Sequence, residues 1–150
     1  MKLATLSVGG EPHAAVQLAN GSWLDIAAAG ASFDSLQSII ETGDAALSAL
    51  RSLVSEADAG QHADAVITDP SLLAPTPQPR KNVFCVGRNY AEHIAEGDRA
   101  QKQNVGVTEH PVYFTKPPTS IVAPGGDILV FPEVSTAIDY EVELAVIIGK

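Results

Sequence analysis

A proline-rich segment divides this sequence into two parts. Four of its ten prolines lie within residues 69–80, "DPSLLAPTPQPR". Prolines at this density remove backbone N–H donors and impose extended conformations, so the segment cannot continue a helix or a central strand. We therefore predict an α+β chain with a small N-terminal domain at residues 1–70, a linker at 71–80 and a second, incomplete domain at 81–150.

The first thirty residues carry β-strand signals. "LATLSV" at residues 3–8 predicts a short strand, and Asn20-Gly21 lies between two runs of apolar character. Asn-Gly supplies the positive φ angles that a type I′ turn requires, so we expect a hairpin with its turn at this dipeptide.

Two helices are expected next. The first has a continuous apolar face, with Asp34 in its first turn, where the helix dipole favours an acid, and it ends at Gly43. The second covers residues 44–57, and both helices are expected to pack on the small sheet. The apolar face of the first helix consists of Phe33, Leu36, Ile39 and Ile40.

Composition excludes several classes of protein. The net charge is −9 with only nine Lys and Arg, so a nucleic-acid partner is not expected. No apolar run approaches the roughly 18 residues that span a bilayer, so no membrane partner is expected either. Cys85 is the only cysteine, which excludes an intrachain disulfide and fits a reducing cytoplasm. We expect Cys85 to be a small buried residue rather than a catalytic thiol.

The second domain is predicted to be rich in β-structure. "NVFCVG" at residues 82–87 is a continuous apolar run that predicts a buried strand. The polar stretch that follows is expected to be mobile and to contain a helical turn. Further strands are predicted at "PVYFT", "SIVA" and "DILVF" and over about residues 140–148.

Three acids alternate in the last of these predicted strands. Side chains of a strand alternate between its faces, so Asp139, Glu141 and Glu143 would share one face. Neighbouring carboxylates on a half-buried face repel each other, and a hard divalent cation such as Mg²⁺ or Mn²⁺ would remove that conflict. A sheet with one solvated face explains the same alternation without an ion, so both interpretations stay open on this stretch alone.

A second group of polar residues follows the first strand of this domain. His93 and Glu96 in "GRNYAEHIAE" are three residues apart and would lie side by side on a helical turn. A carboxylate bonded to one imidazole nitrogen fixes the tautomer and leaves the other nitrogen to accept a proton. Such a pair is also common on a solvated helix face. Lys116, held before two prolines, would either bind an anionic substrate group or be simply exposed.

The order of these motifs resembles the start of the catalytic domain of the fumarylacetoacetate hydrolase family. The resemblance rests on "NVFCVGRNYAEHIAE", "HPVYFTKPPTSIVAPGGDI" and "DYEVELAVIIGK", which together cover residues 81–150 almost continuously. It implies a mixed β-roll fold, a homodimer, and Mg²⁺ or Mn²⁺ bound by Glu141 and Glu143, with Asp139 as a neighbour.

The resemblance also implies an activity. His93, oriented by Glu96 in a lid segment, would draw a proton from water, and the resulting hydroxide would cleave a C–C bond of an acylpyruvate-type 2-oxo acid. The metal would stabilise the enolate. Lys116 and Arg88 would counter negative charge, and Tyr90 would line the pocket. Family relatives that decarboxylate 2-oxo diacids or isomerise enol diacids use the same chemistry, so these are alternative activities.

Family members continue beyond the strand that carries the acids, and an Asp expected there would be the third metal ligand. We therefore hold two hypotheses for this chain. It is either part of a longer enzyme, or a non-catalytic remnant that completes its sheet with another polypeptide.

Overall fold

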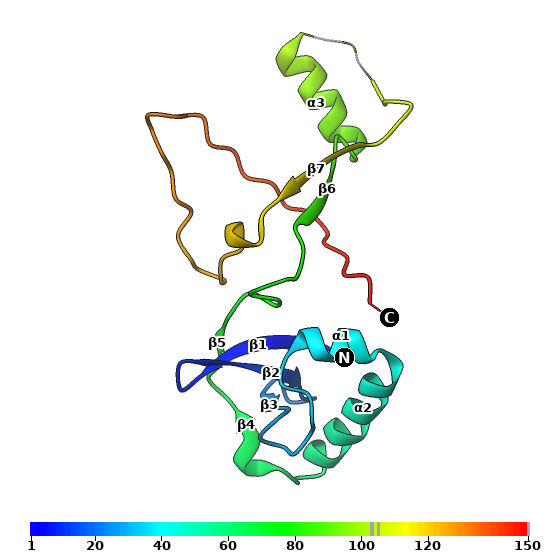
Figure 1. The fold of residues 1–150 in the computed structure, drawn as a ribbon, viewed down its shortest axis with the longest axis vertical. Coiled ribbons are helices and arrows are strands. Elements are labelled where there is room, and N and C mark those ends of the chain that lie inside the picture. The colour runs from blue at the N-terminus through cyan, green and yellow to red at the C-terminus, as the bar shows by residue number, and fades with distance from the viewer. Residues whose placement is uncertain (103, 105, 150) are drawn as a thin grey trace. The chain divides into compact units, whose positions relative to one another are not determined.

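The computed structural model describes residues 1–102, 104 and 106–149. It is an α+β structure, which confirms the predicted class (Figure 1). Along the chain the elements are β1 (Leu3–Val8), β2 (Glu11–Gln17), β3 (Trp23–Asp25), α1 (Leu36–Thr42), α2 (Asp44–Asp58), β4 (Val66–Ile67), β5 (Ser71–Leu72), β6 (Val83–Gly87), α3 (Ala91–Gln101) and β7 (Val112–Lys116), with single 3₁₀ turns at Ala63–Ala65 and Pro118–Ser120.

The chain divides into two compact units. One comprises residues 1–77 together with those from 122 onward, and the other comprises Gln78–Ile121. The division at residue 77 falls inside the segment predicted as a linker. The start of that segment belongs to the first sheet, however, because Ser71–Leu72 form β5 and pair with β1.

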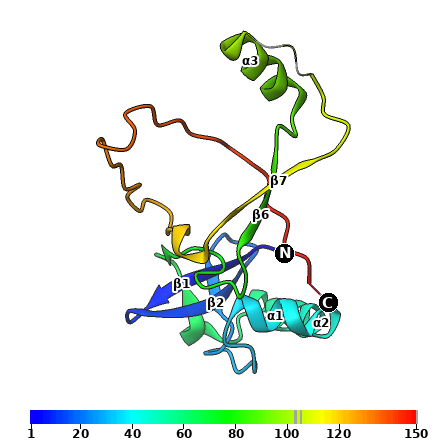
Figure 2. The same ribbon diagram turned by 45° about the horizontal axis from the view of Figure 1, so that its top comes forward.

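The first unit is built on a five-stranded sheet in the order β4-β3-β2-β1-β5. Every neighbouring pair is antiparallel, and β1 pairs with β2 from Leu3↔Val16 to Val8↔Glu11. Gly9 and Gly10 alone connect these two strands, at the tip of the projecting hairpin in Figure 2. Their φ angles are +61° and +93°, the positive values that a two-residue hairpin turn needs.

The predicted hairpin around Asn20-Gly21 is present between β2 and β3, but its turn type differs from the prediction. Only Gly21 has a positive φ, and its N–H donates to the carbonyl of Leu18 at 3.0 Å. The Asn20 side chain accepts hydrogen bonds from the N–H and the hydroxyl of Ser22. These local bonds stabilise a turn in which Asn20 keeps a negative φ, so the type I′ prediction is wrong here.

Both predicted helices are present. Ser35 is the N-cap of α1 and accepts a hydrogen bond from the N–H of Ser38, whose side chain accepts one from the N–H of Ser35. Asp34 therefore precedes the cap and does not lie in the first turn. Hydrogen bonds from the side chains of Ser35 and Ser38 lower the pKa of its carboxyl. Gly43 ends α1, as predicted, at a φ of +72°.

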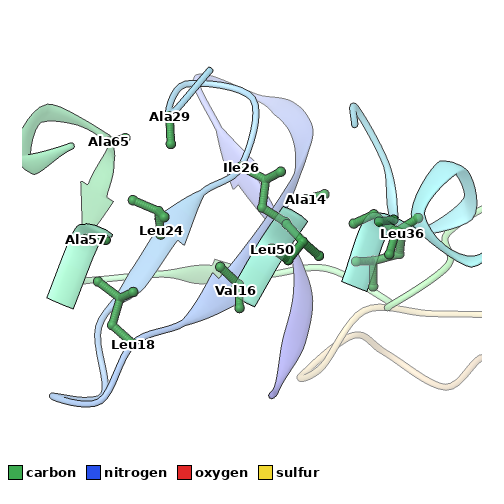
Figure 3. Close-up of a cluster of buried hydrophobic side chains, with 12 residues drawn as sticks. Ala14, Val16, Leu18, Leu24, Ile26, Ala29, Leu36, Leu50, Ala57 and Ala65 are labelled. Atoms are coloured by element: carbon green, nitrogen blue, oxygen red, sulfur yellow. The ribbon is translucent and has the colours of Figure 1, made fainter. Parts of the chain in front are cut away.

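The core of the first unit lies between the sheet and these helices. Figure 3 shows Leu50 of α2 beside Val16 and Ile26, and all three side chains are fully buried. Burying side chains of this size contributes about 1.5–3 kcal/mol each. The first unit therefore has the hydrophobic core that a stable small domain requires.

The second unit contains a single antiparallel ribbon, β6 paired with β7, with α3 between them in sequence. Both strands were predicted, but the expected burial of β6 is wrong. Cys85 is buried, as predicted, whereas Phe84 on the same strand is 72% exposed. A two-stranded ribbon covers little of its own surface, which is why apolar side chains on it stay in contact with solvent.

Three predicted strands do not form. "SIVA", "DILVF" and residues 140–148 have no strand partner within the described residues, and Leu144 and Ile148 are 82% and 92% exposed. An apolar run becomes a strand only when a neighbour completes its hydrogen-bond ladder and covers its side chains. The sequence pattern predicts the propensity of a run but not the presence of that neighbour.

We expect Ser35→Ala to lower the free energy of unfolding of the first unit by about 0.5–2 kcal/mol, because α1 loses the side chain that caps it. Denaturant unfolding followed by circular dichroism measures this change. Ser52→Ala is the matched control. Ser52 is exposed in the middle of α2, where alanine favours the helix. An equal loss in both variants would contradict the capping role.

Candidate functional site

The end of β6 sets the position of the first group of predicted site residues. Arg88 directly follows this strand and has a φ of +55°, so the chain turns sharply there. Tyr90 is the N-cap of α3 and is 46% exposed. The predicted helical turn is a helix of three turns, which carries both His93 and Glu96.

The helix α3 has two chemically different faces. Ile94 is buried and the carboxylate of Asp98 is only 13% exposed, so these residues mark the inner face. His93 and Glu96 are both exposed on the other side, three residues apart and therefore neighbours. Among the described residues they form no hydrogen bond with each other. The helix thus brings the predicted pair together, and its catalytic role stays a prediction.

Asp98 was not singled out by the sequence analysis, although its carboxylate binds two groups of this unit. Its Oδ1 accepts a hydrogen bond from Nη2 of Arg88 at 2.7 Å, and its Oδ2 accepts one from the N–H of Gly106 at 2.9 Å. The guanidinium predicted to meet substrate is therefore bound to a carboxylate of the same chain. Opposite charges ten positions apart follow no spacing rule, so the pairing is visible only in the structure.

Lys116 and Arg88, the two predicted cations, lie at opposite ends of the β6–β7 ribbon. Lys116 pairs with Val83 at one end, whereas Arg88 follows Gly87 at the other. Five residues of strand separate the two positions, or about 16 Å at 3.3 Å per residue. The ammonium of Lys116 lies over the ring of Phe114, 5.9 Å from its centre. The structure therefore does not bring these two cations together.

The alternating acids lie on an extended segment outside any ladder. Asp139, Glu141 and Glu143 are exposed, and Asp139 accepts a hydrogen bond from the N–H of Tyr140 at 2.9 Å. Carboxylate oxygens are the hard donors that Mg²⁺ and Mn²⁺ take, commonly one or two of them together with water, so Glu141 and Glu143 fit such an ion chemically. In the described part of the chain, no three His, Cys, Asp or Glu side chains converge as a metal site.

Each pair of predicted residues belongs to a different unit. His93 and Glu96 lie in the unit of Gln78–Ile121, while Glu141 and Glu143 lie in the other. Each pair is therefore a separate local arrangement: an exposed imidazole–carboxylate helix face, and two carboxylates on an extended strand-like segment. None of the described helices combines the length and apolar character that crossing a membrane requires.

Comparison with known proteins places these residues in one family. Residues 82–150 match the family model described as "Fumarylacetoacetate (FAA) hydrolase C-terminal". This range contains every predicted site residue, from Arg88 to Glu143.

Curated relatives agree with the family match. Over 85 residues the chain is 41% identical to oxaloacetate tautomerase YisK of Bacillus subtilis, covering 56% of this chain and 27% of the relative. Over 111 residues it is 42% identical to the mitochondrial oxaloacetate tautomerase Fahd2a of Rattus norvegicus, covering 74% of this chain and 32% of the relative. The chain thus spans about a third or less of the length of these relatives.

Among solved structures, a fumarylacetoacetate hydrolase from the psychrophile Exiguobacterium antarcticum is 32% identical. The match covers 81% of this chain and 37% of that chain, with a TM-score of 0.49. On the family match and the curated relatives, the chain belongs to the fumarylacetoacetate hydrolase family, and residues 82–150 are part of that family's C-terminal domain.

Proposed function

We propose that this chain supplies the proton-transfer helix and two metal ligands of an enzyme that interconverts the keto and enol forms of oxaloacetate or a similar 2-oxo diacid. The observation that carries the proposal is the exposed His93–Glu96 pair on α3, in a segment similar to oxaloacetate tautomerases. Because the chain spans about a third of those relatives, the activity of the whole enzyme is part of the proposal.

The relatives favour isomerisation over the hydrolysis expected from the sequence. Isomerisation of an enol diacid was the alternative activity, and oxaloacetate tautomerases carry that chemistry in their names. The two activities differ in the source of the proton that the imidazole takes. Hydrolysis takes it from water and needs a hydroxide to attack, whereas tautomerisation takes it from the substrate carbon.

The chemistry needs one group that both accepts and donates a proton. In the keto-to-enol direction the C3–H bond breaks, a C2=C3 double bond forms, and the C2 oxygen gains a proton. A neutral imidazole nitrogen of His93 accepts the carbon-bound proton, and the imidazolium returns a proton to the oxygen. Glu96, the neighbour of His93 on α3, orients the ring by accepting a hydrogen bond from its other nitrogen when substrate is bound.

Other residues of the chain are expected to compensate the negative charge of the substrate. Glu141 and Glu143 would hold Mg²⁺ or Mn²⁺, which supplies Lewis acidity to the 2-oxo acid end of the substrate. Lys116 is exposed at the end of β7, at the opposite end of the ribbon from the start of α3, so its expected contact with a substrate carboxylate stays a prediction. Tyr90, half-exposed at the start of α3, would border the substrate. The homodimer and the cytoplasmic location stay predictions.

The proposal is tested by following oxaloacetate keto–enol exchange by ultraviolet absorbance with the purified protein and Mn²⁺, alongside cleavage of an acylpyruvate. Faster decay to the equilibrium mixture of tautomers, without new carboxylic acid products, supports the tautomerase. Acylpyruvate cleavage without accelerated tautomerisation would instead support the hydrolase.

We expect His93→Ala to lower the rate of tautomerisation about 10²–10⁴-fold, because the group that moves the proton is lost. Stopped-flow absorbance measures the rate, and calorimetric titration of Mn²⁺ should show unchanged affinity. His110→Ala is the control, since His110 is an exposed histidine of the same unit. A matching loss of Mn²⁺ affinity in His93→Ala would mean that this imidazole has another role.

We expect Glu141→Gln and Glu143→Gln each to weaken Mn²⁺ binding about tenfold or more, because an amide has no charge to offset the cation. Loss of even an outer-shell partner costs about 10–100-fold in affinity. Calorimetric titrations with and without oxalate, a planar mimic of the pyruvate enolate, give the affinities. Glu133→Gln removes an equally exposed acid outside the alternating segment. Wild-type affinity in both variants would refute the metal assignment.

A further inference from the structure

We propose that Asp98 is a positioning residue. Through Arg88 and the N–H of Gly106 it fixes α3, so that the face carrying His93 and Glu96 points away from the protein and toward substrate. This role rests on the proposed function, in which His93 moves the proton.

The geometry of α3 separates an anchoring face from a reactive one. At 3.6 residues per turn, Asp98 lies about 40° around the helix axis from Ile94, so both belong to one stripe. His93 and Glu96 are about 60° apart on the opposite side. Exposure agrees with these positions, because Ile94 is 7% exposed while His93 and Glu96 are both exposed. Rotation or fraying of α3 would therefore displace the reactive face directly.

Asp98 connects the start of the segment between β6 and β7 with the stretch that follows α3. Arg88 is its first residue after β6, and Gly106 lies beyond the C-terminus of α3. One carboxylate oxygen binds each of them, at 2.7 Å and 2.9 Å. A single side chain of α3 thus binds residues on both sides of the helix, which limits how far α3 can move.

The backbone at Arg88 indicates that this bond is needed. A non-glycine residue at a φ of +55° is strained, and it persists only where its surroundings hold it. The side chain of Arg88 is 25% exposed, and its Nε is buried without a partner among the described residues. A guanidinium that has lost this much water depends strongly on its carboxylate, because removing one partner leaves an uncompensated charge.

Apolar packing alone holds α3 weakly. In the described part of Gln78–Ile121, the buried apolar side chains are Cys85 and Ile94. A helix of this length is marginal in water unless tertiary contacts stabilise it. The bond between Asp98 and Arg88 is charge-assisted, and such bonds are about twice as strong as bonds between neutral groups.

Amide hydrogen exchange of the purified protein tests the role without requiring activity. Asp98→Asn and Arg88→Gln should each speed exchange of the α3 amides about tenfold, with exchange of the β1–β2 hairpin unchanged. The double variant should exceed the larger single effect by no more than about twofold, because both substitutions break the same bond. Glu109→Gln, an exposed acid in the loop before β7, should match the wild type.

Unchanged exchange of the α3 amides in Asp98→Asn would overturn the proposal. So would a double variant in which the increase in exchange rate equals the product of the two single increases. If Asp98→Asn also exposes β6 and β7, Arg88→Lys decides, because it keeps the charge but not the planar fork. Faster exchange confined to α3 in Arg88→Lys supports the positioning role, whereas equal loss across the ribbon overturns it.

Turnover of oxaloacetate supplies the readout that a merely structural role would not change. Asp98→Asn should lower kcat about tenfold with KM within about twofold, because the substrate contacts remain while the proton-transfer group is displaced. A loss of active protein with kcat per folded molecule unchanged would overturn the role. Wild-type protein without turnover would instead refute the proposed function, while hydrogen exchange still decides whether Asp98 fixes α3.

Discussion

The hydrogen-bond ladder between β6 and β7 is the constraint on which the candidate site depends. It runs without interruption from Val83↔Lys116 to Gly87↔Val112, so it fixes both where the chain leaves the ribbon and where it returns. Residues 88–111 must therefore start and end at the same end of the ribbon. This closure places Arg88, α3 and Gly106 close enough for one carboxylate to connect them.

The two units are stabilised by different means. The first has a sheet with a fully buried apolar core, and its helices carry no predicted chemistry. In the second, among the described residues, a short ladder and an ion pair do much of what a core does in the first. An element with few buried contacts moves more easily, so α3 depends on the bond between Arg88 and Asp98 to hold its position. The predicted proton-transfer pair, His93 and Glu96, therefore lies in the unit with the smaller core.

Sequence signals predicted an element correctly where the residues that determine it lie within the element itself. The apolar faces of α1 and α2, the glycine that ends α1, and the apolar runs of β6 and β7 lie within their own sequences. The glycine pair at the β1–β2 turn was overlooked, although its φ angles are those of the predicted turn type. The runs "SIVA" and "DILVF" failed as strand predictions because a strand also needs a partner that its own residues do not specify.

By itself, the sequence determined the α+β class, the residues that could carry chemistry and, through motif order, the family. These depend on residue type and spacing, which the chain carries locally. Only the tertiary structure decided that Arg88 is bound to Asp98, that Lys116 lies at the other end of the ribbon, and that His93 and Glu96 face solvent. Those properties arise from contacts between residues far apart in the chain, and such contacts form only once the ladder has brought their elements together.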